Sequence, residues 1–159
     1  MAAVTGKPSK IVNKYRGTGY ASTNENVNDI KVFRTAEMYL IGAEARAEQG
    51  QFTGANSGES DFNALREARI NSYTNQIFPS KDALIQVVMD GRFKKLPFEG
   101  HRFWDLKRRS LPIQRLASDA STPASATLQA NDYHFVLPIP NAEISGNPLI
   151  QQNEGYATK

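Results

Sequence analysis

The chain has 159 residues and a mass of 17.6 kDa, which is the size of a single domain. It contains no cysteine, which excludes disulfide scaffolds, zinc ribbons and thiol nucleophiles. Hydrophobic residues make up 40% and charged residues 22%, and the mean hydropathy is −0.51. The longest apolar run, Leu84–Met89, is far shorter than the ~20 residues of a membrane helix. The composition therefore predicts a globular domain rather than a membrane span or a disordered tail.

The net charge is +3, from 19 basic and 16 acidic residues, and the excess is uneven. Eight Lys or Arg residues lie between Arg92 and Arg115, against only Glu99 and Asp105. Such a cluster is compatible with an anion-binding patch, but a solvated helix face with some arginines in structural ion pairs is the favoured interpretation. We therefore expect no nucleic-acid partner.

The first 32 residues are polar and rich in turn-forming residues, and they show neither helical nor strand periodicity. They predict a connecting arm over 1–32, followed by a folded domain over 33–159. Apolar residues then recur at helical spacing from Phe33, and Gly50 supplies a left-handed cap, which predicts a helix over 33–49. Ser60 is the expected N-cap of a second helix. Together the two helices predict a tetratricopeptide-like hairpin.

Ser80 is the expected N-cap of a third helix, and Pro97 should break it, so we expect a kinked or paired helix over 81–109. Residues 110–132 lack periodicity and predict a long loop. The run 133–137 predicts a short strand that the two following prolines confine to a sheet edge. Asn141 is then expected to cap a brief helical turn. The predicted fold is mainly α: the hairpin, a further helix pair and an irregular Pro-rich C-terminal segment with a short strand.

Three motifs in this order resemble the carboxy-terminal part of the SusD/RagB family. They are RTAEMYLIGAEA from Arg34, FEGHRFWDLKR over 98–108, and LPIPNAEI from Leu137, the last followed by Asn147-Pro and by QNEGY over 152–156. Two departures from the family pattern are Asp90-Gly91-Arg92, where a Glu-Arg pair is usual, and Pro97 just before the second motif. The resemblance implies a tetratricopeptide-like α/α superhelix.

The same resemblance implies a function. Members of this family are non-catalytic, lipid-anchored proteins of the outer membrane that bind glycans or other nutrients at the cell surface. They deliver oligosaccharide to a SusC-type TonB-dependent transporter. Members are several times longer than this chain, so the resemblance implies a carboxy-terminal portion whose leader, lipid anchor and main oligosaccharide contacts lie elsewhere. It implies no cofactor, and weak or no glycan binding by these residues alone.

Arg102 is the residue around which we expect the second motif to be organised. On a continuous helix, Glu99 and Asp105 would each lie three residues from it, so its guanidinium would join two carboxylates at a crossing point of helices. A two-carboxylate glycoside hydrolase is the alternative, but an arginine between the acids would keep both ionised. A metal site at Glu99, His101 and Asp105 is not expected, because Glu99 and His101 face different directions on a helix.

The C-terminal motif predicts a mechanical role. Pro138 and Pro140 fix their own φ angles, so Ile139 should be held extended and pressed into a helix groove. Glu143 is expected to accept from a basic residue in 102–109. The residues expected to hold the fold together are Arg34, Glu37, Glu99, Arg102, Asp105, Pro138, Ile139, Pro140 and Glu143.

Carbohydrate recognition uses aromatic platforms with a few polar groups, and two residues are candidates for such contacts. Tyr20, in the polar arm, has no evident packing role. Trp104 is the other candidate, although its place between Phe103 and Asp105 favours burial. A helical-repeat scaffold for protein interactions remains an alternative function for the hairpin.

Overall fold

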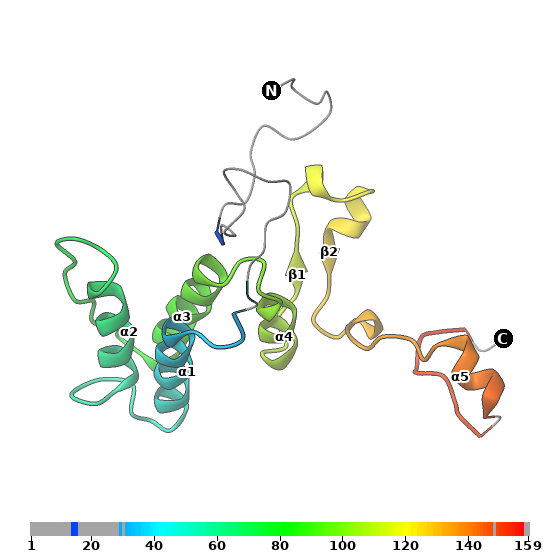
Figure 1. Cartoon of the computed structure of the whole chain (residues 1–159), viewed down its shortest axis with the longest axis horizontal. Helices are drawn as coiled ribbons and strands as arrows, with labels where there is room; N and C mark the ends of the chain where they lie inside the picture. The colour runs from blue at the N-terminus through cyan, green and yellow to red at the C-terminus, as the bar shows by residue number, and fades with distance from the viewer. Residues whose placement is uncertain (1–13, 16–28, 30, 148, 158–159) are drawn as a thin grey trace. The chain divides into compact units, whose positions relative to one another are not determined.

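The computed structural model describes residues 14–15, 29, 31–147 and 149–157. The chain divides into two units, Met1–Arg34 and Thr35–Lys159. The first unit spans all of the expected arm, 1–32, and Tyr20 lies outside the described residues. The helices and strands of the second unit are α1 (Thr35–Glu48), α2 (Gly58–Glu67), α3 (Lys81–Lys95), α4 (His101–Arg108), β1 (Ile113–Gln114), β2 (Thr127–Leu128) and α5 (Asn141–Gly146) (Figure 1).

Helices α1 and α2 form the expected hairpin, and both caps follow from local sequence. Gly50, at φ 83°, ends α1: its N–H donates to the Ala47 carbonyl and the Gln51 N–H donates to the Arg46 carbonyl, which is a Schellman motif. The expected N-cap of α2 is wrong by three residues. Ser57 is the N-cap, and Ser60 is its partner in a capping box in which each side chain accepts from the other's backbone N–H.

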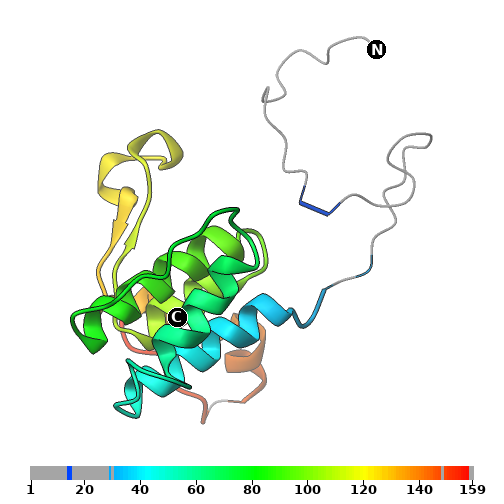
Figure 2. The ribbon, with the colours of Figure 1, turned by 90° about the vertical axis from the view of Figure 1, so that its left-hand side faces the viewer.

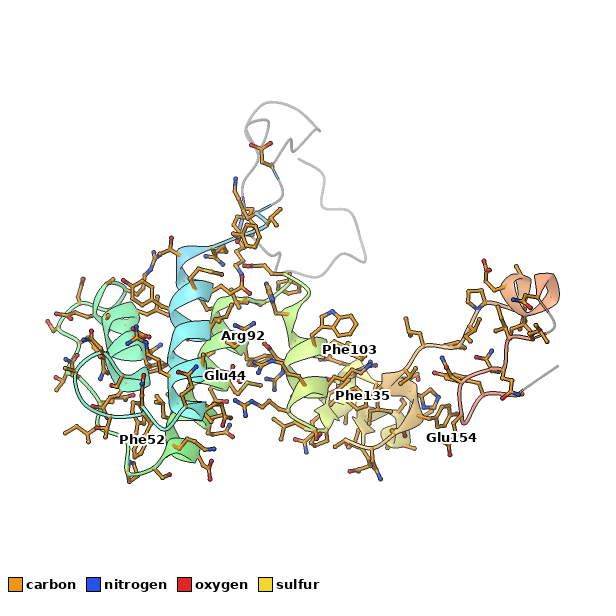
Figure 3. The ribbon with its side chains drawn as sticks, turned by 90° about the horizontal axis from the view of Figure 1, so that it is seen from below. Glu44, Phe52, Arg92, Phe103, Phe135 and Glu154 are labelled. Carbon is orange, nitrogen blue, oxygen red and sulfur yellow. The ribbon has the colours of Figure 1, made fainter. Side chains whose placement is uncertain are left out.

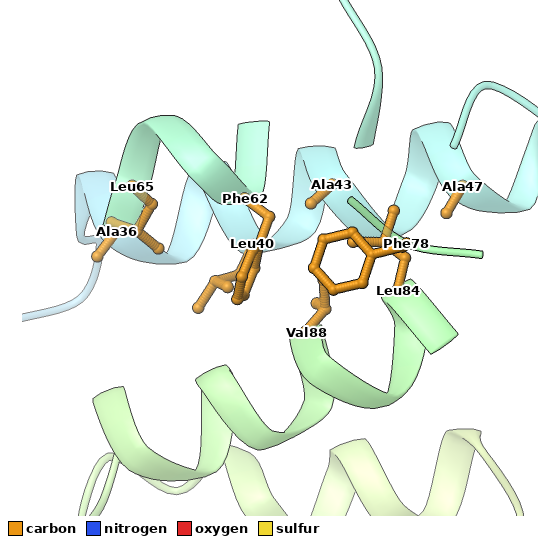
Figure 4. Close-up of a cluster of buried hydrophobic side chains, with 9 residues drawn as sticks. All are labelled: Ala36, Leu40, Ala43, Ala47, Phe62, Leu65, Phe78, Leu84 and Val88. Carbon is orange, nitrogen blue, oxygen red and sulfur yellow. The ribbon is translucent and has the colours of Figure 1, made fainter. Parts of the chain in front are cut away.

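The hydrophobic core lies between α1, α2 and α3, which run side by side in Figures 1 and 2. Side chains one helical turn apart on α1 meet side chains from α2, α3 and the segment between them (Figure 4). The core residues are Ala36, Leu40, Ala43, Ala47, Phe62, Leu65, Phe78, Leu84 and Val88. Phe62 and Phe78 meet edge to face, with ring centroids 5.7 Å apart. The apolar period thus correctly predicted burial of Ala36, Leu40, Ala43 and Ala47, whereas Phe33 and Tyr39, which follow the same spacing, are exposed.

Small residues allow α1 and the start of α2 to approach closely. A Cβ atom at Gly58 would lie 2.4 Å from the Ala43 carbonyl oxygen and 2.9 Å from Leu84 Cδ2. A Cβ at Gly42 would lie 2.9 Å from the Asp61 carboxylate. The hairpin therefore depends on glycine at position 58, where the Cβ of any other residue would meet the backbone of α1.

The expected break at Pro97 separates α3 from α4. Ser80 caps α3 as predicted, its hydroxyl accepting from the Ala83 N–H at 3.2 Å. After α3, Phe98 (φ 64°) and Gly100 (φ 79°) both adopt the left-handed conformation, and α4 begins only at His101. Glu99 therefore lies in the turn and not on the helix. This corrects the expectation that Glu99 and Arg102 share one helix face.

The segment 110–132 is more ordered than its sequence predicts. Strands β1 and β2 pair antiparallel, with Ile113 opposite Leu128 and Gln114 opposite Thr127. The expected strand over 133–137 is wrong, because Tyr133–Phe135 forms a 3₁₀ helix. The Asp132 side chain caps this turn by accepting from the His134 N–H at 2.9 Å. The apolar and aromatic composition of 133–137 favoured a strand, but the hydrogen bond from the His134 N–H to the Asp132 side chain stabilises a turn there instead.

The C-terminal segment is held by polar side chains of its own tail. Gln152 accepts from the Ile139 N–H at 2.8 Å and donates to the Ile139 carbonyl at 2.9 Å, as a neighbouring strand would. Tyr156 donates to the Val136 carbonyl at 2.8 Å. Ile139 is half-buried against this tail, where we expected a helix groove. Phe135 instead makes the contact with a helix: its ring stacks on Phe103 of α4, with centroids 5.5 Å apart.

The predicted fold class is confirmed, because the chain is mainly helical around the α1–α2 hairpin and the α3–α4 pair. None of the helices in the described ranges is long and apolar enough to cross a membrane.

Candidate functional site

A buried charge network joins α1, α3 and α4 (Figure 3). Arg92 of α3 donates through Nε to Asp105 Oδ2 of α4 at 2.8 Å, and both side chains are buried. The Arg92 Nη2 atom lies 3.7 Å from Glu37 Oε1 of α1, and His101 Nδ1 lies 3.4 Å from the same oxygen. Glu37 thus faces two basic side chains that come from two other helices.

Glu44 is the second acidic centre of the network. Arg108 donates to it twice, once at 2.7 Å through Nη2, and Arg109 donates to it through Nε at 2.7 Å. Burial alone would raise the pKa of the Glu44 carboxyl, but the hydrogen bonds and charges of the two arginines outweigh it and hold the pKa below its ordinary value. Arg108 also bonds Asp105 at 3.0 Å, which makes the two halves of the network continuous.

Replacement of Glu44 by Gln should lower the free energy of unfolding at neutral pH by roughly 1–2 kcal/mol. The expected loss is smaller than for a fully buried pair, because Arg108 is partly exposed and solvent screens its charge. Because the pKa of Glu44 is lowered in the folded state, its contribution is present above the ordinary value of 4.5 and disappears as the pH falls through the folded pKa. Urea unfolding of the parent and the variant between pH 7 and pH 3 measures how the difference in their free energies of unfolding changes with pH. A difference that stayed constant over that range would contradict the assignment.

Arg102 does not occupy the position that we expected. It is exposed, and its guanidinium lies over the Phe93 ring, 4.7 Å from the centroid. Asp105 is held instead by Arg92 and Arg108. The physical reason is that Asp105 faces α3 across the helix interface, where Arg92 is buried, whereas Arg102 projects to solvent. Of the expected structural residues, Glu37 and Asp105 are in the network.

The remaining expected residues lie elsewhere. Arg34 belongs to the first unit, where its guanidinium lies 5.8 Å from the centroid of the Tyr15 ring. Pro138 and Pro140 are exposed on either side of Ile139, and Glu143 is exposed on α5. No ion pair is recorded within the described residues between Glu143 and the basic run 102–109, so that expected contact is not formed there.

The sequence analysis missed Arg92, Glu44, Arg108 and Arg109 as organising residues. One signal was available: Glu37 and Glu44 are seven residues apart on the same face of α1 as Leu40 and Ala47, and an acid on an apolar stripe needs a buried basic partner. The identity of that partner depends on how α3 and α4 pack. Several arginines of the basic run are thus structural, in agreement with the favoured interpretation of that cluster.

Helices α3 and α4 and the turn between them carry a set of aromatic side chains, most of them exposed. Trp104 is 63% exposed, which corrects the expectation that it is buried. Its ring meets Phe103 edge to face at 5.2 Å, and Lys107 Nζ lies 5.6 Å from its centroid. Phe98 is 81% exposed and Phe93 is 55% exposed. We call Phe93, Phe98, Phe103 and Trp104 the aromatic surface.

A hollow of about 410 Å³ lies beside this surface. Its walls include Phe93, Phe98 and Phe103, with Arg102 and His101 among its polar residues, and Arg92 also lines it. The volume falls within the roughly 300–1,000 Å³ of small-molecule sites, and mainly apolar walls with a few polar groups are their usual lining. Within the described ranges, no cluster of three or more potential metal-ligating side chains is found.

Comparisons with known proteins agree with one another. The model of the SusD family matches residues 5–156. SusD-like protein P2 of Formosa agariphila is 31% identical over 155 residues, which cover 92% of this chain and 30% of that protein. Starch-binding protein SusD of Bacteroides thetaiotaomicron is 32% identical over 129 residues, which cover 80% of this chain and 22% of that protein. The chain therefore spans less than a third of the length of these curated relatives.

A solved structure shows the same likeness in three dimensions. A SusD superfamily protein from Bacteroides vulgatus is 29% identical and superposes with a TM-score of 0.68, over 87% of this chain and 30% of that one. The helical hairpin, the ordered motifs and the family match lead to one conclusion: the chain belongs to the SusD family.

Proposed function

We propose that the chain is the carboxy-terminal part of a non-catalytic, glycan-binding lipoprotein of the outer membrane. In this proposal the whole protein captures an oligosaccharide at the cell surface and delivers it to a SusC-type TonB-dependent transporter. Membership of the SusD family supports the proposal, as does the name of one relative, Starch-binding protein SusD. The main oligosaccharide contacts lie in the part of the protein outside these 159 residues.

The observation in this chain that carries the proposal is the exposed Trp104. Burial of an indole ring is favourable, so a tryptophan left 63% exposed, with the Phe103 ring at its edge, makes a platform for an apolar face. The faces of sugar rings are such surfaces, and Lys107, whose Nζ lies 5.6 Å from the centroid of the Trp104 ring, supplies donors for hydroxyl groups. Trp104 is therefore the proposed ligand contact of this part of the protein.

The state of the carboxylates argues against the hydrolase alternative. A glycosidase needs one carboxylic acid with a raised pKa to protonate the leaving group. Asp105 and Glu37 face Arg92, and the pKa of Glu44 is lowered by Arg108 and Arg109. The arginines thus favour the charged form of Glu44, and all three acids are tied to basic side chains of neighbouring helices. They support a structural role and a non-catalytic protein.

Titration of the 159-residue chain with neutral and acidic hexasaccharides, followed by NMR, tests the proposal. We expect weak binding to at least one glycan, and Trp104→Ala should reduce it roughly fivefold to tenfold because one ring stack is lost. Trp104→Phe should retain most of the affinity. Tyr39→Ala changes an exposed aromatic residue on α1, so it serves as the control and should leave binding unchanged. Equal binding by the Trp104→Ala variant would exclude this residue as a contact.

The partner assignment needs a separate test. Purification of the full-length protein from outer membranes should recover a TonB-dependent transporter in stoichiometric amount. A helical-repeat scaffold remains the alternative, because Met38, Tyr39 and Ile41 leave apolar surface exposed on α1. Recovery of a soluble protein partner in place of the transporter would favour that alternative.

A further inference from the structure

One terminal nitrogen of Arg92, Nη1, has no acceptor among the described residues. Its side chain is 6% exposed, its Nε donates to Asp105, and its Nη2 lies near Glu37. The Nη1 atom is buried and makes no hydrogen bond to any described residue. A buried donor without an acceptor is costly, and native proteins nearly always supply one from protein, water or ligand. Arg92 is also a lining residue of the 410 Å³ hollow, which can supply that acceptor from outside the chain.

The charges around Arg92 select the kind of acceptor. Asp105 and Glu37 already balance the charge of Arg92, and His101 lies against Glu37. A carboxylate or sulfate placed at Nη1 would lie close to both buried acids and would be repelled by them. A neutral oxygen, such as a hydroxyl, accepts one hydrogen bond without this repulsion. The site therefore favours a neutral ligand over an anionic one.

The rim of the hollow fits a ring with one apolar face. Phe98 has a left-handed backbone (φ 64°), which is unfavourable for a phenylalanine, and its side chain is almost fully exposed although it borders the hollow. Strain of this kind is retained where a local geometry is useful. On another side, Arg102 lies across the Phe93 ring and leaves a donor at the entrance. Aromatic walls with arginine donors among the lining residues together match a saccharide ring.

We propose that this hollow is a subsite for one neutral pyranose unit, which stacks on Phe98 and accepts a hydrogen bond from Arg92 Nη1 through a hydroxyl oxygen. This inference rests on the proposed glycan-binding function. It adds a location distinct from Trp104, which is not a lining residue of the hollow, and a preference for uncharged sugars.

The test uses the 159-residue chain with arginine side chains labelled with ¹⁵N. Neutral hexasaccharides of glucose, mannose and xylose are titrated in parallel with oligogalacturonate and oligoalginate. We expect a neutral glycan to bind at least fivefold more tightly than either acidic one and to shift the Arg92 guanidinium signals. Arg66, whose Nε is also buried and without a hydrogen-bond partner among the described residues, provides the internal reference and should not shift.

Phe98→Ala is the variant, and Phe33→Ala is the matched control, because both phenylalanines are 81% exposed and only Phe98 borders the hollow. Phe98→Ala should weaken binding of the neutral glycan roughly fivefold, and Phe33→Ala should leave it unchanged.

The outcomes separate the subsite from the proposed function. If Trp104→Ala weakens binding, whereas Phe98→Ala leaves binding unchanged and the Arg92 signals do not shift, the subsite is wrong and the proposed function stands. Tighter binding of the acidic glycans, or a water molecule alone at Nη1 in a glycan-bound crystal structure, would also overturn the subsite. Absence of binding by every glycan would overturn the subsite and deprive the proposed function of its support in this chain.

Discussion

Replacement of Asp105 by Ala is expected to lower the free energy of unfolding by roughly 3–5 kcal/mol, the usual effect of removing one partner of a buried ion pair. Arg92 would keep its charge in the core, because an arginine cannot be deprotonated in a protein, and would retain only the longer contact with Glu37. Arg108 would lose one of its two acidic partners at the same time. The measurement is equilibrium unfolding in urea, followed by helical circular dichroism.

Two control variants distinguish loss of the buried ion pair from loss of a charge at the surface. Asp90→Ala removes an exposed aspartate of α3 and should change stability by no more than about 0.5 kcal/mol. Arg102→Ala should also have a small effect, because Arg102 contacts Phe93 at the surface and does not pair with Asp105. A larger loss for Arg102→Ala than for Asp105→Ala would mean that Arg102 is the organising residue after all.

Replacement of Phe62 by Ala is expected to cost a similar amount, roughly 3–5 kcal/mol. Phe62 is 2% exposed, lies in the core between α1 and α3, and meets Phe78 edge to face. Its loss would leave a cavity that the close backbone contact between Gly58 and Ala43 prevents from collapsing. Thermal unfolding of the variant measures the loss.

Phe33→Ala is again the appropriate control, because it removes the same side chain from an exposed position. Its effect on stability should stay within about 0.5 kcal/mol. If the two variants had equal melting temperatures, the core would not lie where α1, α2 and α3 meet.

Helix α4 contributes both to the buried network and to the aromatic surface. On α4, Asp105 and Leu106 are buried, while Arg102 and Trp104 are exposed. Ion pairs to α1 and α3 fix the helix in position, and Phe135 packs on Phe103. The proposed ligand contact therefore rests on a rigid support, which lowers the entropic cost of binding.

Local sequence determined the elements whose signals are complete within a few residues. The apolar period of α1, the left-handed Gly50, the Ser80 cap and the break at Pro97 all lie where the sequence places them. The cap of α2 was misplaced because a Ser-x-x-Ser capping box offers two equivalent candidates, Ser57 and Ser60. The ordered motifs were also sufficient to identify the family.

Only the tertiary structure decided which side chains meet. Spacing along α4 suggested Arg102 as the partner of Asp105, but the packing of α3 against α4 places Arg92 there and leaves Arg102 and Trp104 in solvent. Likewise, Phe135 and not Ile139 contacts a helix, because Gln152 satisfies the backbone of Ile139 from the tail. A helical period fixes the direction of a side chain relative to its own helix. The neighbour that it meets depends on contacts between segments far apart in the chain, such as Glu44 and Arg108, and no local pattern contains that information.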